Sequence, residues 1–468
     1  MKHILLKGAL MGAAVILGSI GAQAAWTYDA GAGTLSDGNY SFSAKVVTKT
    51  DPSNNQSVKG FEVKGTTVGS GDLDFTNVGT DMTGDYAGYN VISLKQDGTD
   101  NRFVNSIESC TKLTAPHVLE LDTYLFFKNG YLKEIVLSDG DEVKVTEIPE
   151  RCFNTETSVL EKITPTKFPY VKTITKTFAF KGAAALKGDF SFPNMTCIGN
   201  GAFMGTGITG FSAPKLEEFE DSYGAFRGCS SLTGDLYFAE LKYVGNCAFY
   251  QASKITSFVA PKATYVMQYG LASATSLTNV QLAANVTSYA NSAFTSCQNL
   301  ETFSPMPIVL SDLANTYDGN GNIQSLSDSF QGCNKLVGTI EITGTEELKT
   351  LTANWMQNCK AITNVTIKAP ALETVANNVF QNVGPGAAIY WDSEKAPTSF
   401  GENAFSPEGG NIRTRIYVTS DLDGWLKLGT AVTAEDKART DFPKRAFCVI
   451  NGNVYVVDGR AGLCIRIQ

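Results

Sequence analysis

The chain has 468 residues, including 10 cysteines and 2 histidines, and a formal charge of −8. Cysteine is far below the ~8–10% of a small disulfide-stabilised protein, and glycine and proline are near average usage, so neither a disulfide scaffold nor a collagen-like chain is indicated. An acidic chain is repelled by phosphate backbones and by anionic membranes, which argues against nucleic-acid partners.

Residues 1–24 have the pattern of a secretory signal peptide. Lys2 and Lys7 precede an apolar run that ends at Ile20, and Ala22-Gln23-Ala24 has the small-x-small form of a cleavage site. The apolar run is short for a bilayer span, and a transmembrane anchor is the alternative interpretation. We expect a secreted, extracellular or cell-surface protein with no membrane span in the mature chain. Removal of the two lysines changes the formal charge from −8 to −10.

Residues 25–100 are predicted to form a β-rich N-terminal cap. The region contains short alternating runs such as Tyr40-Ser41-Phe42. The segment 71–77, Gly-Asp-Leu-Asp-Phe-Thr-Asn, resembles the segment 188–194, Gly-Asp-Phe-Ser-Phe-Pro-Asn. We therefore expect the cap to merge into the structure that follows and to cover its first edge.

An apolar side chain recurs about every 23 residues through the middle of the chain, and in most copies it is a phenylalanine that follows an alanine. A constant period of this length is typical of repeat proteins. Less regular copies stand at Ile107, Phe127, Phe153, Met356, Phe380 and Phe405. The regular positions, which we call anchors, are Phe180, Phe203, Phe226, Phe249, Leu271, Phe294 and Phe330.

One repeat shows why the period exists. Phe226, Cys229 and Leu232 are spaced by three, which places them on one face of a short helix or 3₁₀ turn. The segment 236–238, Leu-Tyr-Phe, then alternates as a strand does. One unit cannot bury its own apolar face, so the units must stack. We predict a leucine-rich-repeat-like solenoid over residues 101–411, with a parallel β-sheet and short helical or 3₁₀ corners.

Residues 412–468 break the period and are predicted to form a C-terminal β cap. Phe447–Ile450, Val454–Val457 and Leu463–Ile467 have the pattern of three strands, and Asn-Gly and Asp-Gly pairs separate them. The sequence indicates a β-meander that closes the solenoid, or a small separate domain.

The motifs of the repeats resemble a known family. Ala225–Leu232 and Ala293–Leu300 are similar to the AF-x-x-C-x-x-L core of BspA-like bacterial leucine-rich repeats, and Leu277–Asn285 fits the general strand pattern of leucine-rich repeats. The resemblance implies a secreted or surface protein that binds other macromolecules, often in adhesion. It implies no reaction and no cofactor, and it transfers no particular ligand.

Five cysteines are expected in one buried ladder, three residues after their anchors, because alanine fills the same position in other repeats. Cys448 and Cys464 lie on the first and third strands of the expected meander, and whether they form a disulfide is left open. The cysteines of the ladder are Cys110, Cys229, Cys297, Cys333 and Cys359.

Catalytic and metal-binding patterns are weak. His117 is the one histidine of the mature chain, so neither a multi-histidine zinc site nor a catalytic triad with a G-x-S-x-G motif is indicated. The G-x-G-x-x-G segment at 205–210 leads into a strand, the reverse of a dinucleotide-binding context. The segment 318–322 has the alternating oxygens of a calcium loop, but we expect a polar surface loop there. No catalytic, cofactor-binding or metal-ligating residue is predicted.

The middle residue of each repeat strand is expected to point outward and to form a ligand-binding face. Ordinary solvent-facing strand residues are the alternative interpretation. The predicted function is non-catalytic binding or adhesion to an extracellular protein or glycan. The alternatives are a structural envelope or matrix component, or a carbohydrate-acting enzyme with its chemistry in a flanking region. The candidate face comprises Ser191, Ser212, Tyr237, Val259, Gln281, Ser304, Glu341, Thr366 and Tyr390.

Overall fold

The computed structural model describes residues 24–311, 329–405, 415–418, 420–421, 424–425, 446–450 and 453–457, with short gaps at 67–68, 99–102, 105–106, 156–158, 175–176, 221–223, 287, 345–347, 352 and 385–386. Residues 1–23 of the expected signal peptide, the segment 318–322, Cys464 and the expected strand Leu463–Ile467 lie outside the described residues.

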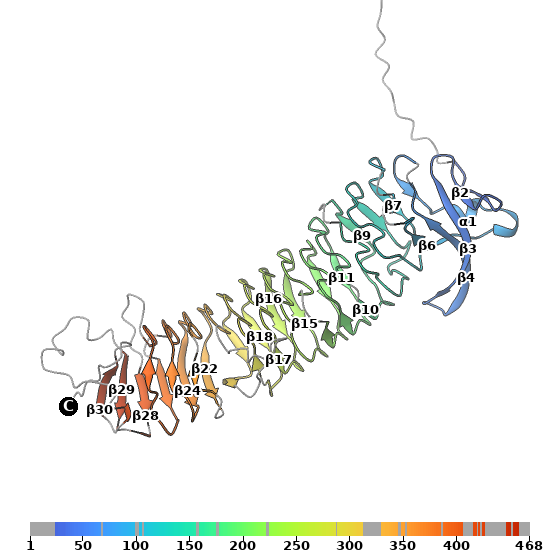
Figure 1. Ribbon diagram of the computed structural model, residues 1–468. Helices are drawn as coiled ribbons and strands as arrows, with labels where there is room; N and C mark the ends of the chain where they lie inside the picture. The colour runs from blue at the N-terminus through green and yellow to red at the C-terminus, as the bar shows by residue number, and fades with distance from the viewer. Residues whose placement is uncertain are drawn as a thin grey trace, which may run out of the picture.

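The chain forms an elongated solenoid that begins at an N-terminal sheet (Figure 1). In that sheet β1 to β4 are antiparallel neighbours, and β6 pairs parallel with β4. A short helix, α1 (Val78–Asp81), and a 3₁₀ turn, η1 (Gly84–Tyr86), lie between β5 (Leu73–Asp74) and β6. The strands of the N-terminal sheet are β1 (Thr27–Asp29), β2 (Thr34–Ser36), β3 (Ser41–Asp51), β4 (Gln56–Lys64) and β6 (Val91–Lys95).

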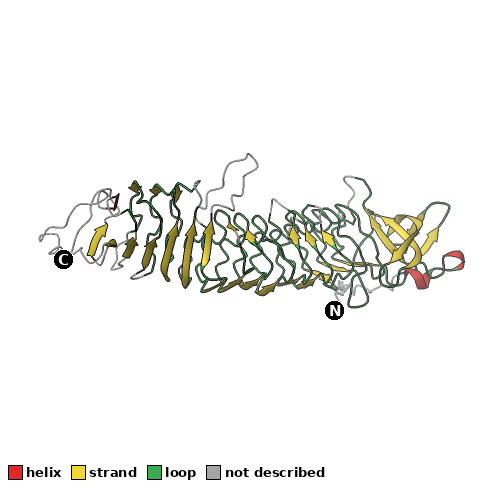
Figure 2. Ribbon diagram, turned by 90° about the horizontal axis from the view of Figure 1, so that it is seen from below, coloured by secondary structure: helices red, strands yellow, loops and turns green. Residues whose placement is uncertain are grey.

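Two rows of parallel strands, which we call the first and the second ladder, run along the solenoid (Figure 2). Among the described residues the first ladder is divided into four hydrogen-bonded sheets and the second into three. The strands of the first ladder are β5 (Leu73–Asp74), β7 (Lys112–Thr114), β8 (Glu134–Val136), β9 (Lys162–Thr164), β11 (Asp189–Ser191), β13 (Gly210–Ser212), β15 (Gly234–Tyr237), β16 (Ile255–Val259), β18 (Asn279–Gln281), β20 (Thr302–Ser304), β21 (Ile308–Ser311), β22 (Gly338–Thr343), β24 (Ile362–Lys368), β26 (Ala388–Trp391), β28 (Arg415–Val418) and β29 (Ala446–Ile450). The second ladder comprises β10 (Thr173–Ile174), β12 (Cys197–Ile198), β14 (Glu218–Phe219), β17 (Tyr265–Val266), β19 (Ser288–Tyr289), β23 (Thr350–Leu351), β25 (Thr374–Val375) and β27 (Ser399–Phe400).

The anchors form the spine of a continuous core, as the period predicts. The rings of Phe180, Phe203, Phe226 and Phe249 stack at centroid distances of 4.8, 5.3 and 5.1 Å, with interplanar angles of 10° or less. All four are fully buried in one apolar cluster that reaches from the N-terminal sheet to Trp425. The stacked repeats therefore share one core rather than forming separate lobes.

Two of the less regular early positions are wrong. Phe126, and not Phe127, is the fully buried ring that stacks on Phe153 at 5.6 Å. One turn earlier Phe103 occupies the equivalent place. The backbone N–H of Phe103 donates to the carbonyl oxygen of Leu125 in the next turn, and the backbone N–H of Phe126 donates in the same way to that of Cys152. Ile107, predicted as a less regular copy, instead lies in the turn after Phe103, where its carbonyl oxygen accepts a hydrogen bond from the backbone N–H of Cys110.

The described corners are turns rather than the short helical or 3₁₀ segments expected. Around Phe226 the backbone N–H groups of Cys229 and Leu232 each donate three residues back. Gly224 and Gly228, two residues on either side of the anchor, have positive φ angles of 68° and 73°. Left-handed residues at these two places interrupt a helix, so each corner closes after one turn.

At the C-terminal end the sheet continues past residue 411. β28 pairs parallel with β26, and β29 pairs parallel with β28. β30 (Asn453–Val457) pairs antiparallel with β29, in agreement with the first two strands of the expected meander.

Candidate functional site

The nine residues of the predicted face all point away from the core on strands of the first ladder. Register places them side by side: Tyr237 opposite Val259, Val259 opposite Gln281, and Gln281 opposite Ser304. Tyr237 is 60% exposed, although its neighbours in the sequence, Leu236 and Phe238, are buried. We call these nine residues, with Tyr417, the strand row. In two further sheets the register places Ser191 opposite Ser212, and it places Glu341, Thr366, Tyr390 and Tyr417 opposite one another in that order.

Tyr417 is a member of the row that the sequence analysis missed. It lies opposite Tyr390, and the two rings stack at 5.0 Å with an interplanar angle of 16°. Tyr390 is 45% exposed. The pair therefore presents a double aromatic surface at the C-terminal end of the row.

The row carries little charge. Glu341 is its one charged member, and its carboxylate pairs with Lys368 two residues along the next strand, at 3.2 Å. A surface with hydroxyls, amides and aromatic rings but no net charge suits contacts made by hydrogen bonds and ring packing.

The thiols of the ladder are held inside. Cys229, Cys297, Cys333 and Cys359 are fully buried and free of disulfides. Each lies within hydrogen-bond distance of the carbonyl oxygen of the anchor one turn earlier, at 3.0 to 3.3 Å. Burial raises the pKa of the Cys297 thiol to about 12. Cys110 is also buried and free, but it follows its corner at the position that Leu232 takes in a later repeat.

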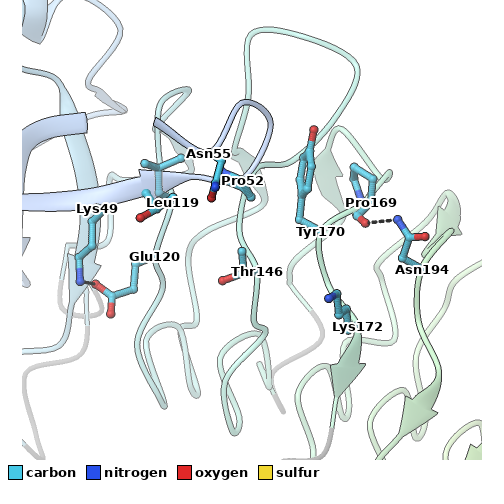
Figure 3. Close-up of a pocket in the computed structure, with 11 residues that line it drawn as sticks. Lys49, Pro52, Asn55, Leu119, Glu120, Thr146, Pro169, Tyr170, Lys172 and Asn194 are labelled. Atoms are coloured by element: carbon cyan, nitrogen blue, oxygen red, sulfur yellow. Dashed lines mark hydrogen bonds and ion pairs between the residues drawn. The ribbon is translucent and has the colours of Figure 1, made fainter. Parts of the chain in front are cut away.

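A second candidate site lies where the hairpin β3–β4 meets the solenoid. There the structure has a cavity of about 540 Å³ (Figure 3). Its walls come from the hairpin, from the segment that follows β7 and from the corners between the two ladders. We call it the junction pocket. Its lining residues are Lys49, Thr50, Pro52, Asn55, Leu119, Glu120, Thr146, Pro169, Tyr170, Lys172 and Asn194.

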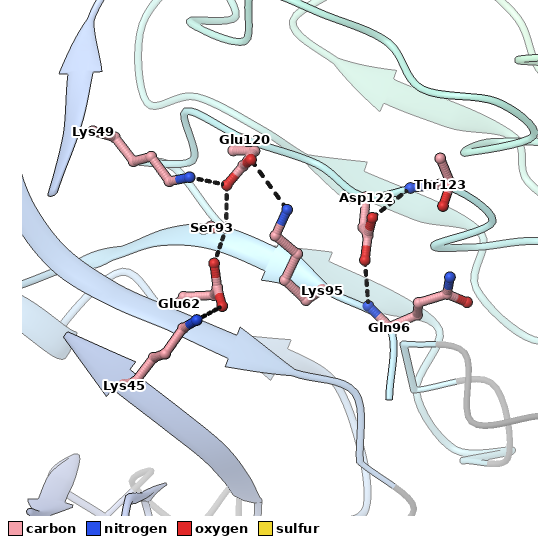
Figure 4. Close-up of polar contacts among 9 residues, drawn as sticks. All are labelled: Lys45, Lys49, Glu62, Ser93, Lys95, Gln96, Glu120, Asp122 and Thr123. Carbon is pink, nitrogen blue, oxygen red and sulfur yellow. Dashed lines mark hydrogen bonds and ion pairs between the residues drawn. The ribbon is translucent and has the colours of Figure 1, made fainter. Parts of the chain in front are cut away.

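Glu120 of the pocket wall and Glu62 both approach the hydroxyl of Ser93 (Figure 4). The Ser93 hydroxyl lies 2.8 Å from Glu120 Oε2 and 3.4 Å from Glu62 Oε2. Lysines neutralise both acids: Lys45 is 2.8 Å from Glu62, and Lys49 is 2.5 Å from Glu120.

The pairing keeps Glu120 ionised. Burial raises the pKa of its carboxyl, but hydrogen bonds from Lys49, Ser93 and Lys95 outweigh that effect and lower the pKa to about 2. A carboxyl with this pKa carries no proton to donate near neutral pH, so the geometry fits a structural network better than general acid catalysis.

Among the described residues, no group of three or more histidines, cysteines or acids is arranged to hold a metal ion. His117 is half-buried and lines a small cavity of about 120 Å³ with Asp139 and Lys144. No helix of the described residues is long and apolar enough to span a membrane.

Several solved structures are similar to this chain. A leucine-rich repeat protein from Bacteroides ovatus is 18% identical with a TM-score of 0.44, over 82% of this chain and 95% of that one. The pneumococcal vaccine antigen PcpA is 14% identical with a TM-score of 0.32, over 85% and 95%. A leucine-rich cell surface protein from Faecalibacterium prausnitzii is 15% identical with a TM-score of 0.32, over 84% and 96%. No curated protein matches the chain.

A family model also matches the repeats. The model described as a BspA type leucine rich repeat region, in six copies, matches residues 99–233, 222–326 and 319–420. These ranges cover more than half of the chain and include the stacked anchors and the buried thiols. The sequence motif, the repeat geometry and the family model agree, and the chain belongs to the BspA-type leucine-rich repeat family.

Proposed function

We propose that this protein is an exported, non-catalytic binding protein, secreted or held at the cell surface, that uses the strand row to attach to an extracellular protein or glycan. The observation that carries the proposal is the row itself. Outward residues stand in register within each sheet, the one charge of the row is already paired, and the row ends in the stacked pair of the exposed Tyr390 and the half-buried Tyr417.

The physical support lies in rigidity and composition. Tyrosine offers a large contact area for little loss of conformational entropy, and a sheet with fixed register holds such side chains at fixed spacing. Tyr237 is 60% exposed, so its ring is available to a partner without any rearrangement of the core.

The test is an array of matrix proteins and glycans probed with the mature chain and with the double variant Tyr237→Ala, Tyr390→Ala. We expect the wild type to bind at least one class of ligand and the double variant to lose about tenfold or more in affinity, because exposed aromatic anchors dominate such contacts.

The control is Tyr250→Ala. Tyr250 follows the anchor Phe249 in a corner of the solenoid and lies on no strand of either ladder. Its ring centroid is 5.4 Å from the guanidinium carbon of Arg227. This variant should bind as the wild type does. Unchanged binding by a correctly folded double variant would contradict the proposal, and self-assembly without any ligand would favour a structural component instead.

A further inference from the structure

The two walls of the junction pocket are joined by contacts outside the cavity. The tip of the β3–β4 hairpin is fixed by Asp51, whose carboxylate accepts hydrogen bonds from the backbone and the hydroxyl of Ser53 at 2.8 and 2.5 Å. The same carboxylate pairs with Lys144 of the solenoid at 2.9 Å. Burial opposes ionisation of Asp51, but these contacts outweigh it and leave its pKa below the usual value. The hairpin wall is therefore tied to the solenoid wall before any ligand arrives.

The opposite wall presents an aromatic ring. Figure 3 shows the Tyr170 side chain standing between the hairpin tip, at Pro52 and Asn55, and Pro169. Asn194 supports this wall, since its amide donates to the carbonyl oxygen of Pro169 at 2.8 Å. A half-buried tyrosine ring in a cleft suits the apolar face of a flat ring ligand.

The pocket is cationic although the chain is acidic. Lys49 is neutralised by Glu120 at 2.5 Å, and Glu120 is shared with Lys95 at 3.1 Å. Within the described part of the chain, the ammonium group of Lys172 has no ion-pair partner. The lining residues therefore have a net charge of +1, in a chain of formal charge −8.

Polar side chains also line the cavity around this charge. The hydroxyls of Thr50 and Thr146 and the amide of Asn55 line the same cavity and are exposed to solvent. About 540 Å³ lies within the ~300–1,000 Å³ range of small-ligand sites, and the mixed polar lining is unlike a lipid site.

We propose that the junction pocket binds a carboxylated sugar residue of a glycan. The ring of Tyr170 packs on the C–H face of the pyranose, Lys172 pairs with its carboxylate, and the hydroxyls and amide bind its hydroxyl groups. This site is separate from the strand row, and the proposal stands independently of the function proposed above.

The test is calorimetric titration of the mature chain with three probes: a uronic-acid oligosaccharide, a sialylated oligosaccharide, and the neutral oligosaccharide in which the carboxylate is reduced to an alcohol. We expect one or both acidic probes to bind about tenfold more tightly than the neutral one, with affinity that falls as salt rises. The first two arms distinguish a uronate source from a sialic-acid source.

Two variants assign the effect to the pocket. Lys172→Gln should remove the preference for the acidic probe and leave neutral binding unchanged, whereas Tyr170→Ala should weaken all three probes. Lys254→Gln, an exposed lysine outside the pocket, is the matched control and should change nothing.

The proposal is overturned if no probe binds, if acidic and neutral probes bind equally, or if Lys172→Gln keeps the full preference. Tyr237→Ala, Tyr390→Ala should leave this titration unchanged, so failure at the pocket and failure at the strand row are distinguishable. Thermal melts of each variant confirm that the solenoid is intact.

Discussion

Phe226 lies between two parallel rings, those of Phe203 and Phe249, and is fully buried. Phe226→Ala leaves a cavity in the spine and should cost about 3–5 kcal/mol of unfolding free energy. Phe226→Leu should cost clearly less, because Leu271 fills the same position in another turn. Urea unfolding of both variants gives the comparison.

Tyr237→Ala is the surface control for that measurement and should change the free energy of unfolding by no more than about 0.5 kcal/mol. If the leucine and alanine variants lost equal stability, ring volume would not be what the anchor contributes.

Cys297 is confined by its neighbours rather than poised for reaction. Its thiol lies 3.2 Å from the Leu271 carbonyl oxygen, and burial raises its pKa to about 12. Because the thiolate is the reactive form, a thiol reagent near neutral pH should label Cys297, Cys333 and Cys359 slowly in the folded protein and fast after denaturation without reductant.

Mass spectrometry of labelled peptides reads out each cysteine. Cys297→Ala should cost about 1 kcal/mol or less, since alanine occupies this place at Ala252 and Ala274. Rapid labelling of Cys297 in the folded chain would show that the ladder is open to solvent.

Ion pairs join the N-terminal sheet to the first turns of the solenoid. Glu120 follows β7 and joins Lys49 on β3 and Lys95 on β6. Its folded-state pKa of about 2 lies below its ordinary value of 4.5. Its contribution to stability is therefore complete above about pH 4.5 and is lost as the pH falls through about 2.

Glu120→Gln should lose less stability than the wild type over that interval, as followed by urea unfolding at a series of pH values. Glu240→Gln, which removes an exposed pair with Lys262, is the control and should keep the wild-type slope. Identical slopes for wild type and Glu120→Gln would remove this network as a source of acid sensitivity.

At the scale of the whole molecule, the period of the sequence predicted the features that recur from turn to turn. The spacing of Phe226, Cys229 and Leu232 and the alternation around Tyr237 follow from one stacked unit, so the core, the buried thiols and most of the strand row could be anticipated. The similarity of 71–77 to 188–194 also marked a real strand, since β5 pairs parallel with β7.

Features that depend on irregular or distant segments could not be anticipated. Tyr417 was missed because the predicted solenoid ended at residue 411, although the ring of Phe405 stacks on that of Phe380 at 5.5 Å and marks one more turn. The left-handed corner positions hold Gly228, Gln251 and Asn358 alike, so hydrogen bonds between turns, and not residue type, specify them. The junction pocket depends on how the β3–β4 hairpin docks on solenoid turns that are distant in the sequence, from Leu119 to Asn194, which no local pattern encodes.

The N-terminal sheet covers apolar surface that the solenoid cannot bury alone. Phe42 of β3 packs on Phe75 at 5.3 Å and on Phe103 at 5.7 Å, and β4 pairs with β6. Deletion of residues 24–66 would leave β6 with an unpaired edge and expose both rings, and exposed strand edges beside apolar surface promote association.

We therefore expect the deleted chain to self-associate with rising concentration while the full chain does not, as measured by light scattering coupled to size-exclusion chromatography. A shorter deletion, of residues 24–36, keeps β4 on β6 and retains Phe42, and it should associate less. A monomeric 24–66 deletion with an unchanged melting temperature would mean that the first turns of the solenoid close their own end. Since each turn is stabilised mainly by its immediate neighbours, the loss should be greatest in the first turns and should fade along the coil, which hydrogen exchange can resolve turn by turn.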